Sequence, residues 1–367
     1  MTILRELHDR HGQSIWIDDF RRAHLTDGTL TRRIADGVRG LTSNPTIFAK
    51  AITGSQDYDE QFARLIAGGA DPEAAYWTMV VDDIQAVCDR FDAVHSDSGG
   101  VDGFVSVEVS PTLARDTAGT VAAARELRRR VDRGNAMIKI PATAEGLPAI
   151  RRLIGEGTSV NVTLIFGLDR YAQVMEAYIA GLEDLAADGT ADLSSVASVA
   201  SLFVSRIDTE VDRRLAAATP AGSELAGTAG LCQSRLAYSE FRTTFSGPRW
   251  EALAARGARV QRPLWASTGT KNPAYPDVMY VDGLIGPDTV NTVPTATLDA
   301  FLDHGRVERT VDADPTTTAT WAALAAAPVD MADVAEVLER EGLDSFAASF
   351  DEVLTALATK ASQLDGP

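Results

Sequence analysis

Short apolar stretches typical of β-strands alternate along this chain with longer stretches in which apolar residues recur at helical spacing. Eight β-like stretches occur, at residues 14–20, 39–46, 103–110, 136–142, 158–166, 195–207, 262–268 and 288–294. Eight strands that alternate with helices predict an α/β protein, a closed parallel (β/α)8 barrel of the TIM-barrel type. An open doubly wound sheet is the alternative. No glycine-rich phosphate loop follows the first predicted strand, which disfavours that alternative.

Helical periodicity also fills segments that a minimal barrel does not need. Residues 47–100 and 209–260 are predicted to form additional helices, and residues 306–367 add a further helical segment. No repeat or low-complexity linker divides the chain. We therefore expect a barrel domain over residues 1–305 and a helical C-terminal extension, residues 306–367, that packs on the outside of the barrel.

The fourth predicted strand contains a lysine, Lys139, between Ile138 and Ile140. Because side chains alternate between the two faces of a strand, the isoleucines face the surrounding helices and Lys139 points to the barrel axis. By the same count Leu164 faces the helices. The side chains expected at the axis or at strand ends are Trp16, Asp18, Asn44, Glu108, Asn161, Thr163, Ser201, Phe203, Trp265 and Ser267, with Arg206 just beyond the sixth strand. Active sites of such barrels form at the C-terminal strand ends, so this set is the candidate site.

The inward-facing set favours the chemistry of a lysine amine. It contains carboxylates, amides and hydroxyls but no histidine or cysteine, which argues against a metal centre and against a Ser–His–Asp arrangement. Burial leaves more of a lysine amine uncharged, and neighbouring carboxylates can carry protons, so attack on a carbonyl to form a Schiff base is expected. Only four of the 34 basic residues are lysines, and arginine cannot replace a nucleophilic amine, so the presence of Lys139 is informative.

The overall charge limits the class of partner. A formal net charge of −18 argues against nucleic acid or an anionic membrane, but a small phosphorylated ligand needs only a local positive site. Cys88 and Cys232 lie far apart without metal-type spacing and are expected to be reduced core residues. The N-terminal residues do not resemble a signal peptide, and no apolar stretch is long enough to cross a membrane, so we expect a cytoplasmic protein.

Five motifs occur in the order in which transaldolases carry them: "GLTSNPTIF" (40–48), "SVEVSPTLARDT" (106–117), "MIKIPAT" (137–143), "SVNVTLIF" (159–166) and "SLFVSRID" (201–208). The chain resembles the transaldolases over nearly all of residues 14–302, and the larger bacterial members are also similar across 14–20 and 265–294. The resemblance implies a cofactor-free, metal-free enzyme of the pentose phosphate pathway. It would transfer a dihydroxyacetone unit from sedoheptulose 7-phosphate to glyceraldehyde 3-phosphate, giving erythrose 4-phosphate and fructose 6-phosphate.

The resemblance also implies catalytic roles. Lys139 looks like the Schiff-base lysine, and Asp18 resembles the acid/base that takes the proton from the C4 hydroxyl of the donor. Glu108 and Thr163 are similar to the pair that positions a catalytic water. The positions that match substrate-binding residues are Asn44, Asn161 and Ser201 for the dihydroxyacetone hydroxyls, Phe203 for the pocket wall and Arg206 for a phosphate.

One departure from the family pattern concerns the second phosphate. Smaller transaldolases carry an arginine shortly after a serine on the seventh strand, whereas this chain reads "ASTGTKNP" there. Ser267 and Lys271 are the candidates for that role, and Asp19 is a weaker alternative to Asp18 as the acid. Two other functions stay open: an aldolase that releases free dihydroxyacetone from fructose 6-phosphate, and a barrel that binds sugar phosphates without turnover. A monomer or a homodimer is expected.

Overall fold

The structure, a computed structural model, describes residues 2–187, 189, 191–218 and 224–364. Its centre is a closed barrel of parallel strands in the order β1 to β8, with β8 pairing back to β1. The strands are β1 (Gln13–Ile17), β2 (Leu41–Thr42), β3 (Val105–Glu108), β4 (Ala136–Pro141), β5 (Val160–Ile165), β6 (Ser198–Phe203), β7 (Arg262–Ala266) and β8 (Thr289–Val293). Each falls on one of the eight predicted stretches, so the (β/α)8 barrel is confirmed, and closure of the sheet excludes the doubly wound alternative.

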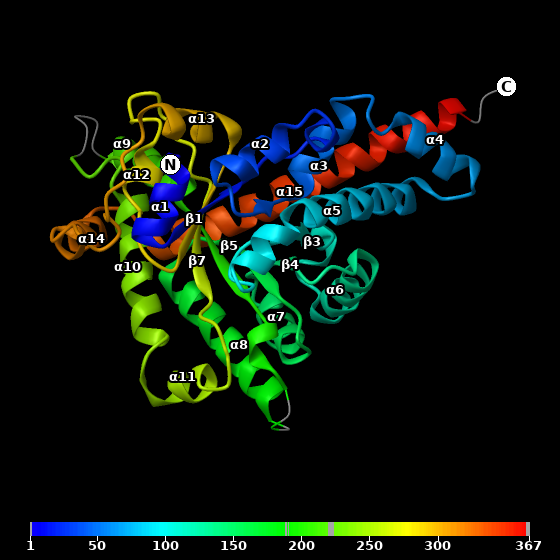
Figure 1. Ribbon diagram of the computed structural model, residues 1–367. Helices are drawn as coiled ribbons and strands as arrows, with labels where there is room; N and C mark the ends of the chain where they lie inside the picture. Colours follow the sequence, from blue (N-terminus) through cyan, green and yellow to red (C-terminus); the bar gives the residue numbers. More distant parts are fainter. Residues whose placement is uncertain (1, 188, 190, 219–223, 365–367) are drawn as a thin grey trace.

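Helices surround the barrel (Figure 1), and several of them begin at a residue whose side chain accepts a hydrogen bond from the first turn. Asp71 and Asp116, for example, accept hydrogen bonds from Ala74 N and Gly119 N and so satisfy free amide groups at the starts of α5 (Pro72–Asp97) and α6 (Thr117–Val131). The helices are α1 (Ile3–His11), α2 (Thr29–Asp36), α3 (Pro45–Thr53), α4 (Asp59–Ala67), α5 (Pro72–Asp97), α6 (Thr117–Val131), α7 (Gly146–Gly155), α8 (Leu168–Ala186), α9 (Val204–Ala218), α10 (Ala229–Thr244), α11 (Gly247–Ala254), α12 (Met279–Asp282), α13 (Thr295–His304), α14 (Thr317–Ala326) and α15 (Met331–Leu364), with short 3-10 turns at η1 (Arg22–Leu25), η2 (Pro111–Leu113) and η3 (Leu193–Ser195). Residues 47–100 and 209–260 are therefore mostly helical, as predicted.

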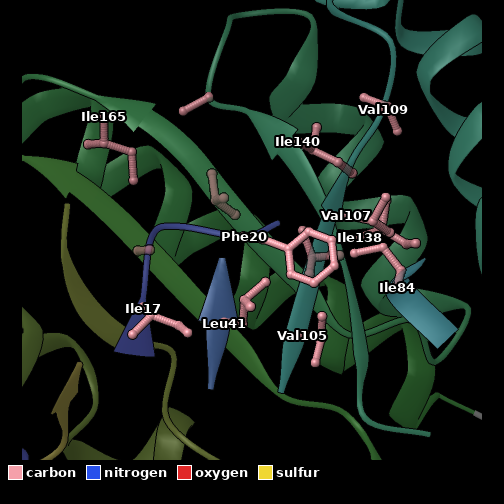
Figure 2. Close-up of a cluster of buried hydrophobic side chains, with 14 of the residues drawn as sticks. Ile17, Phe20, Leu41, Ile84, Val105, Val107, Val109, Ile138, Ile140 and Ile165 are labelled. Carbon is pink, nitrogen blue, oxygen red and sulfur yellow. The ribbon is translucent and has the colours of Figure 1, made fainter. Parts of the chain in front are cut away.

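The main hydrophobic core lies between the barrel and its helices. Val105, Val107 and Val109 of the third strand region pack there with Ile138 and Ile140 of β4, and all of them are buried (Figure 2). A second cluster inside and above the barrel contains Trp16, Met137, Leu264 and Val290 among others. The alternation predicted for β1, β3 and β4 is therefore confirmed, and it leaves the opposite parity of these strands free for the polar residues.

Two strands depart from the predicted alternation. Leu164 belongs to the inner cluster rather than the helix-facing core, because the β5–β6 register shifts between Val162 and Ile165 and Leu164 has a φ of 59°. Trp265 was expected at the axis, but it belongs to the helix-facing core, where its indole N–H donates to Leu284 O at 3.1 Å. Ser267 still reaches the axis side because the strand has ended at Ala266 and the backbone turns at Ser267, with a φ of 55°.

The C-terminal helix α15 crosses the carboxyl end of the barrel rather than lying only on its outside. It contacts α9, β5 and η2 on its way to α3, α5 and α4, and the ribbon shows this diagonal path in red (Figure 1). The extension therefore packs on the barrel, but part of it lies over the strand ends. The division into domains at 305/306 stays a prediction, and residues 1 and 365–367 lie outside the described part.

A buried carboxylate closes the opposite, N-terminal end of the barrel. Asp102 accepts hydrogen bonds from Ser14 Oγ at 2.8 Å, Arg39 Nε at 2.6 Å and Arg262 Nη1 at 3.0 Å. Burial alone would raise the pKa of Asp102, but Arg262, Arg39 and these hydrogen bonds outweigh it and lower the pKa to about 2. This network ties the first residues of β1 and β7 to the loop before β3.

Two further expectations concern the chain as a whole. Cys88 and Cys232 are free and buried, as predicted. Within the part of the chain that the structure describes, we find no helix whose length and apolar character would let it cross a membrane.

Candidate active site

A cavity of about 290 Å³ lies at the carboxyl ends of the strands. That volume is near the lower end of the usual range for small-molecule sites. Nine of the eleven predicted site residues line it: Asp18, Asn44, Lys139, Thr163, Ser201, Phe203, Arg206, Ser267 and Lys271. Four lining side chains are basic and only Asp18 is acidic, so a chain of net charge −18 presents a locally positive cavity. Such a cavity suits a small anion.

Lys139 is the buried basic group of this cavity. Its side chain is 5% exposed, and its Nζ lies 3.0 Å from Glu108 Oε2 and donates to Ser43 O at 3.2 Å. Strand register explains the ion pair, since Glu108 and Lys139 are direct neighbours across β3 and β4 and share the inward parity. The amine therefore has a carboxylate within proton-transfer distance, although Glu108 itself lies behind Lys139 and does not line the cavity.

Both carboxyl groups near the lysine bind protons more readily than exposed ones do. Burial raises the pKa of Glu108, against the opposing effect of the Lys139 charge. Burial also raises the pKa of Asp18, against the effects of Lys139 and of a 2.9 Å hydrogen bond from Thr42 Oγ1. Groups with pKa values shifted toward neutrality are suited to act as general acids and bases.

Hydroxyl groups line the side of the cavity formed by β5 and β6, with an amide beneath them. Thr163 Oγ1 is buried and has no hydrogen-bond partner among the described residues, so it can bond a ligand or water. Asn161 lies one layer deeper, where it donates to Ser106 Oγ at 2.9 Å and accepts from Ser201 Oγ at 2.8 Å. Asn161 therefore does not line the cavity, and it orients the Ser201 hydroxyl that does.

Three basic side chains form the rest of the positive cavity: Lys50, Arg206 and Lys271. Arg206 is half-buried in the first turn of α9, and its guanidinium carbon lies 5.3 Å from the centre of the Phe203 ring. Ser267 shares a 2.9 Å hydrogen bond with Ser205, so it is held beside the same turn.

Comparison with known proteins assigns the chain to a family. The family model described as "Transaldolase/Fructose-6-phosphate aldolase" matches residues 15–357. The chain belongs to this family. Curated relatives named "Transaldolase" include those of Saccharopolyspora erythraea, 49% identical over 355 residues and 96% of each chain, and Thermobifida fusca, 50% identical over 363 residues and 97% of each chain. The relative from Frankia alni, also named "Transaldolase", is 48% identical over 351 residues, 95% of this chain and 94% of its own.

The family match extends to residue 357, well into α15, and this helix supplies cavity residues that the sequence motifs did not indicate. Ser345 and Phe346 come from α15, while Thr46 and Lys50 come from α3. Lys50 had a signal, because it is one of only four lysines and follows the "TSNPTIF" motif by two residues. Ser345 and Phe346 had none, since a long amphipathic helix does not reveal which of its turns lies over a barrel.

Asp19, the alternative candidate for the acid/base role in this member of the transaldolase/fructose-6-phosphate aldolase family, lies outside the cavity that Asp18 lines. Asp19 accepts a hydrogen bond from Thr295 Oγ1 at 2.6 Å, at the start of α13, and does not line the cavity. Among the residues described, no cluster of three or more His, Cys, Asp and Glu side chains is placed to hold a metal ion.

Proposed function

We propose that the chain is a transaldolase that moves a dihydroxyacetone unit between sugar phosphates through a Schiff base on Lys139. The observation that carries the proposal is the buried Lys139–Glu108 ion pair, 3.0 Å long, beside a small cavity with basic walls. The names of the relatives, at 48–50% identity over at least 94% of each chain, support the same activity. The substrates are the phosphorylated ketose and aldose that the sequence resemblance implies.

The first half of the proposed reaction joins the donor to the enzyme. Transfer of a proton from Lys139 to Glu108 leaves a free amine, which attacks the C2 carbonyl of the ketose phosphate. Loss of water then gives the protonated imine. Glu108 and the free hydroxyl of Thr163 are suited to bind the water that moves protons in this step and in the final hydrolysis.

The second half breaks and remakes a carbon–carbon bond. Asp18 takes the proton of the C4 hydroxyl, the C3–C4 bond breaks, and its electrons move into the imine to give an enamine on Lys139. The released aldose phosphate leaves, an acceptor aldehyde enters, and the steps reverse with Asp18 returning the proton. Asn44 and Ser201 present polar groups to the hydroxyls of the bound three-carbon unit, and Asn161 orients Ser201 from below.

The phosphate of each sugar is assigned to the basic part of the cavity. Arg206 provides a planar guanidinium that can bond two phosphate oxygens. Ser267 and Lys271 take the second position, in place of the arginine that smaller relatives carry there. Location in the cytoplasm, and a monomeric or homodimeric state, remain predictions from the sequence.

Borohydride trapping tests the proposal. Incubation with fructose 6-phosphate and borohydride should give an irreversible adduct, and peptide mapping should find it on Lys139. The variant Lys139→Arg keeps the charge but loses the nucleophile, so it should give neither adduct nor turnover. Lys360→Arg should keep both, because Lys360 pairs with Asp59 and does not line the cavity. An adduct on another lysine, or none in the wild type, would refute the mechanism.

The family name also covers fructose-6-phosphate aldolases, so release of free dihydroxyacetone is the second candidate. A coupled assay separates the two activities. A transaldolase should produce little dihydroxyacetone from fructose 6-phosphate alone and should turn over when an aldose phosphate acceptor is added. Release without an acceptor at the rate of transfer would favour the aldolase.

A further inference from the structure

The C-terminal helix brings one aromatic side chain directly to the lysine. Phe346 is 3% exposed, it lines the cavity, and its ring centre lies 5.6 Å from Lys139 Nζ. Phe346 therefore covers Lys139 on one side, while the Lys139 amine pairs with Glu108 and donates a hydrogen bond to Ser43 O. Proton transfer to Glu108 does not require Phe346, so the ring has no place in the chemistry described above.

Two local features let α15 approach the strand ends so closely. The backbone shift in β5 turns Leu164 inward, and Gly342 of α15 lies against it. A Cβ atom at position 342 would stand 3.0 Å from Leu164 Cδ2 and 3.6 Å from Arg206 Nη1. A glycine inside a helix costs about 1 kcal/mol relative to alanine, and at this position it gives the helix room to lie on the barrel.

The helix is also fixed beyond Phe346. One turn later, Ser349 Oγ and Thr46 Oγ1 share a 2.8 Å hydrogen bond, which joins α15 to the first turn of α3. Phe350 packs edge-on against Tyr76, with ring centres 5.4 Å apart, and so anchors the helix to α5. Phe346 is therefore held over the lysine by contacts on both sides of it along the helix.

We propose that Phe346 excludes bulk water from the enamine on Lys139 and so favours transfer over release, while the water that Glu108 and Thr163 bind stays available for the final hydrolysis. The proposal rests on the transaldolase function proposed above. Its physical basis is that an apolar wall beside a reactive intermediate prevents side reactions with water. It gives the C-terminal helix a role in the reaction outcome, beyond packing on the barrel.

The step that Phe346 opposes is hydrolytic release. A proton from solvent adds to C3 of the enamine and regenerates the protonated imine. Water then adds to C2, the C2–N bond breaks, and the products are dihydroxyacetone and Lys139 with its amine protonated. Atoms balance with one proton and one water, and no redox partner is needed. Transfer instead forms a bond from C3 to the carbonyl carbon of the acceptor.

The measurement is the ratio of dihydroxyacetone release, without acceptor, to transfer, with a saturating aldose phosphate acceptor. Phe346→Ala should raise this ratio by about tenfold, because water can then reach the intermediate. Phe346→Leu keeps an apolar but smaller side chain and should raise it less. Leu357→Ala is the matched control, since Leu357 is a buried residue of α15 away from the cavity and its loss should leave the ratio unchanged.

Each outcome bears on one proposal or the other. A ratio that rises from wild type to Phe346→Leu to Phe346→Ala supports the role of Phe346. If Phe346→Ala does not fold, a ratio for Phe346→Leu above that of Leu357→Ala carries the same conclusion. Unchanged ratios in folded Phe346 variants overturn this inference alone, provided that the wild type transfers and is trapped on Lys139. A wild type that neither transfers nor is trapped refutes the proposed function instead.

Discussion

At the scale of single residues, the Lys139–Glu108 pair is better explained by chemistry than by stability. Removing two charges from water costs several kcal/mol, and their attraction offsets this only partly. Burial raises the pKa of Glu108, against the opposing effect of the Lys139 charge, and so favours its proton-bearing form. A carboxyl group that readily takes the proton of Lys139 is what formation of a Schiff base requires.

Replacement of Asp18 by asparagine should separate activity from stability. Burial raises the pKa of Asp18 above 3.8, so folding disfavours its charged form. This cost is absent below the pKa that Asp18 has in the unfolded chain, and it grows as the pH rises through the pKa that Asp18 has in the folded protein. Asp18→Asn should therefore raise the melting temperature at pH 7 but not at pH values of about 3. Turnover should fall roughly 10²–10⁴-fold through loss of the acid/base, while trapping on Lys139 persists.

The neighbouring variant Asp19→Asn is the control for Asp18. The Asp19 carboxylate bonds Thr295 and does not line the cavity, so its neutralisation should leave turnover nearly unchanged. A lower melting temperature for Asp18→Asn at pH 7, or equal losses of turnover in the two variants, would contradict the assignment.

At the scale of the elements, the sequence predicts where the strands lie better than it predicts the face on which each side chain lies. The alternation of side chains correctly predicted the faces of Ile138, Ile140 and Lys139, because β4 is a regular strand with unbroken pairing to β5. It failed at Leu164, because the register shift in β5 moves this side chain to the other face and the residue types in the strand do not indicate such a shift. It failed at Trp265 because Leu264 and Ala266 are the inward-facing residues of β7, and Ser267 reaches the axis side only through the backbone turn after the strand.

The start of α3 shows how one side chain serves both the fold and the site. Asn44 Oδ1 accepts a hydrogen bond from Ile47 N at 2.9 Å and caps the helix, and the same side chain lines the cavity. Asn44→Ala should lower the free energy of unfolding by about 1 kcal/mol and also weaken activity. Asn44→Asp keeps the capping oxygen but removes the amide donor, so chemical denaturation should show near-native stability.

Activity distinguishes the two roles of Asn44. The KM of Asn44→Asp for the ketose phosphate should rise roughly tenfold, because a site built to donate a hydrogen bond to a hydroxyl loses that donor. Native KM values in Asn44→Asp would show that Asn44 is only a helix cap.

At the scale of the whole molecule, the part least accessible to sequence reasoning is the route of α15. Its helical periodicity was readable, but a helix of 34 residues can pack against a barrel in many ways. Contacts between residues some 300 positions apart, such as Thr46 with Ser349, decide that Phe346 lies over Lys139. Such contacts depend on the assembled barrel and have no local signature in the chain.

The network at the N-terminal end predicts how the whole molecule responds to acid. Asp102 has an ordinary pKa of 3.8, lowered to about 2 by Arg262, Arg39 and hydrogen bonds that outweigh its burial. Because folding lowers the pKa of Asp102, its charged form stabilises the fold fully above pH 3.8, and this stabilisation is lost as the pH falls through about 2. The difference between the two values corresponds to about 2 kcal/mol.

Urea unfolding between neutral pH and pH 2 measures this contribution. Asp102→Asn should be less stable than the wild type at pH 7, because Arg262 and Arg39 then face a neutral partner, and the difference should shrink by about 2 kcal/mol as the solution is acidified. The Asp18→Asn variant provides the opposite sign, since its difference from the wild type favours the variant at neutral pH. If the gap between wild type and Asp102→Asn does not change with pH, the carboxylate does not carry its charge in the folded barrel, and the N-terminal network holds β1 and β7 by hydrogen bonds alone.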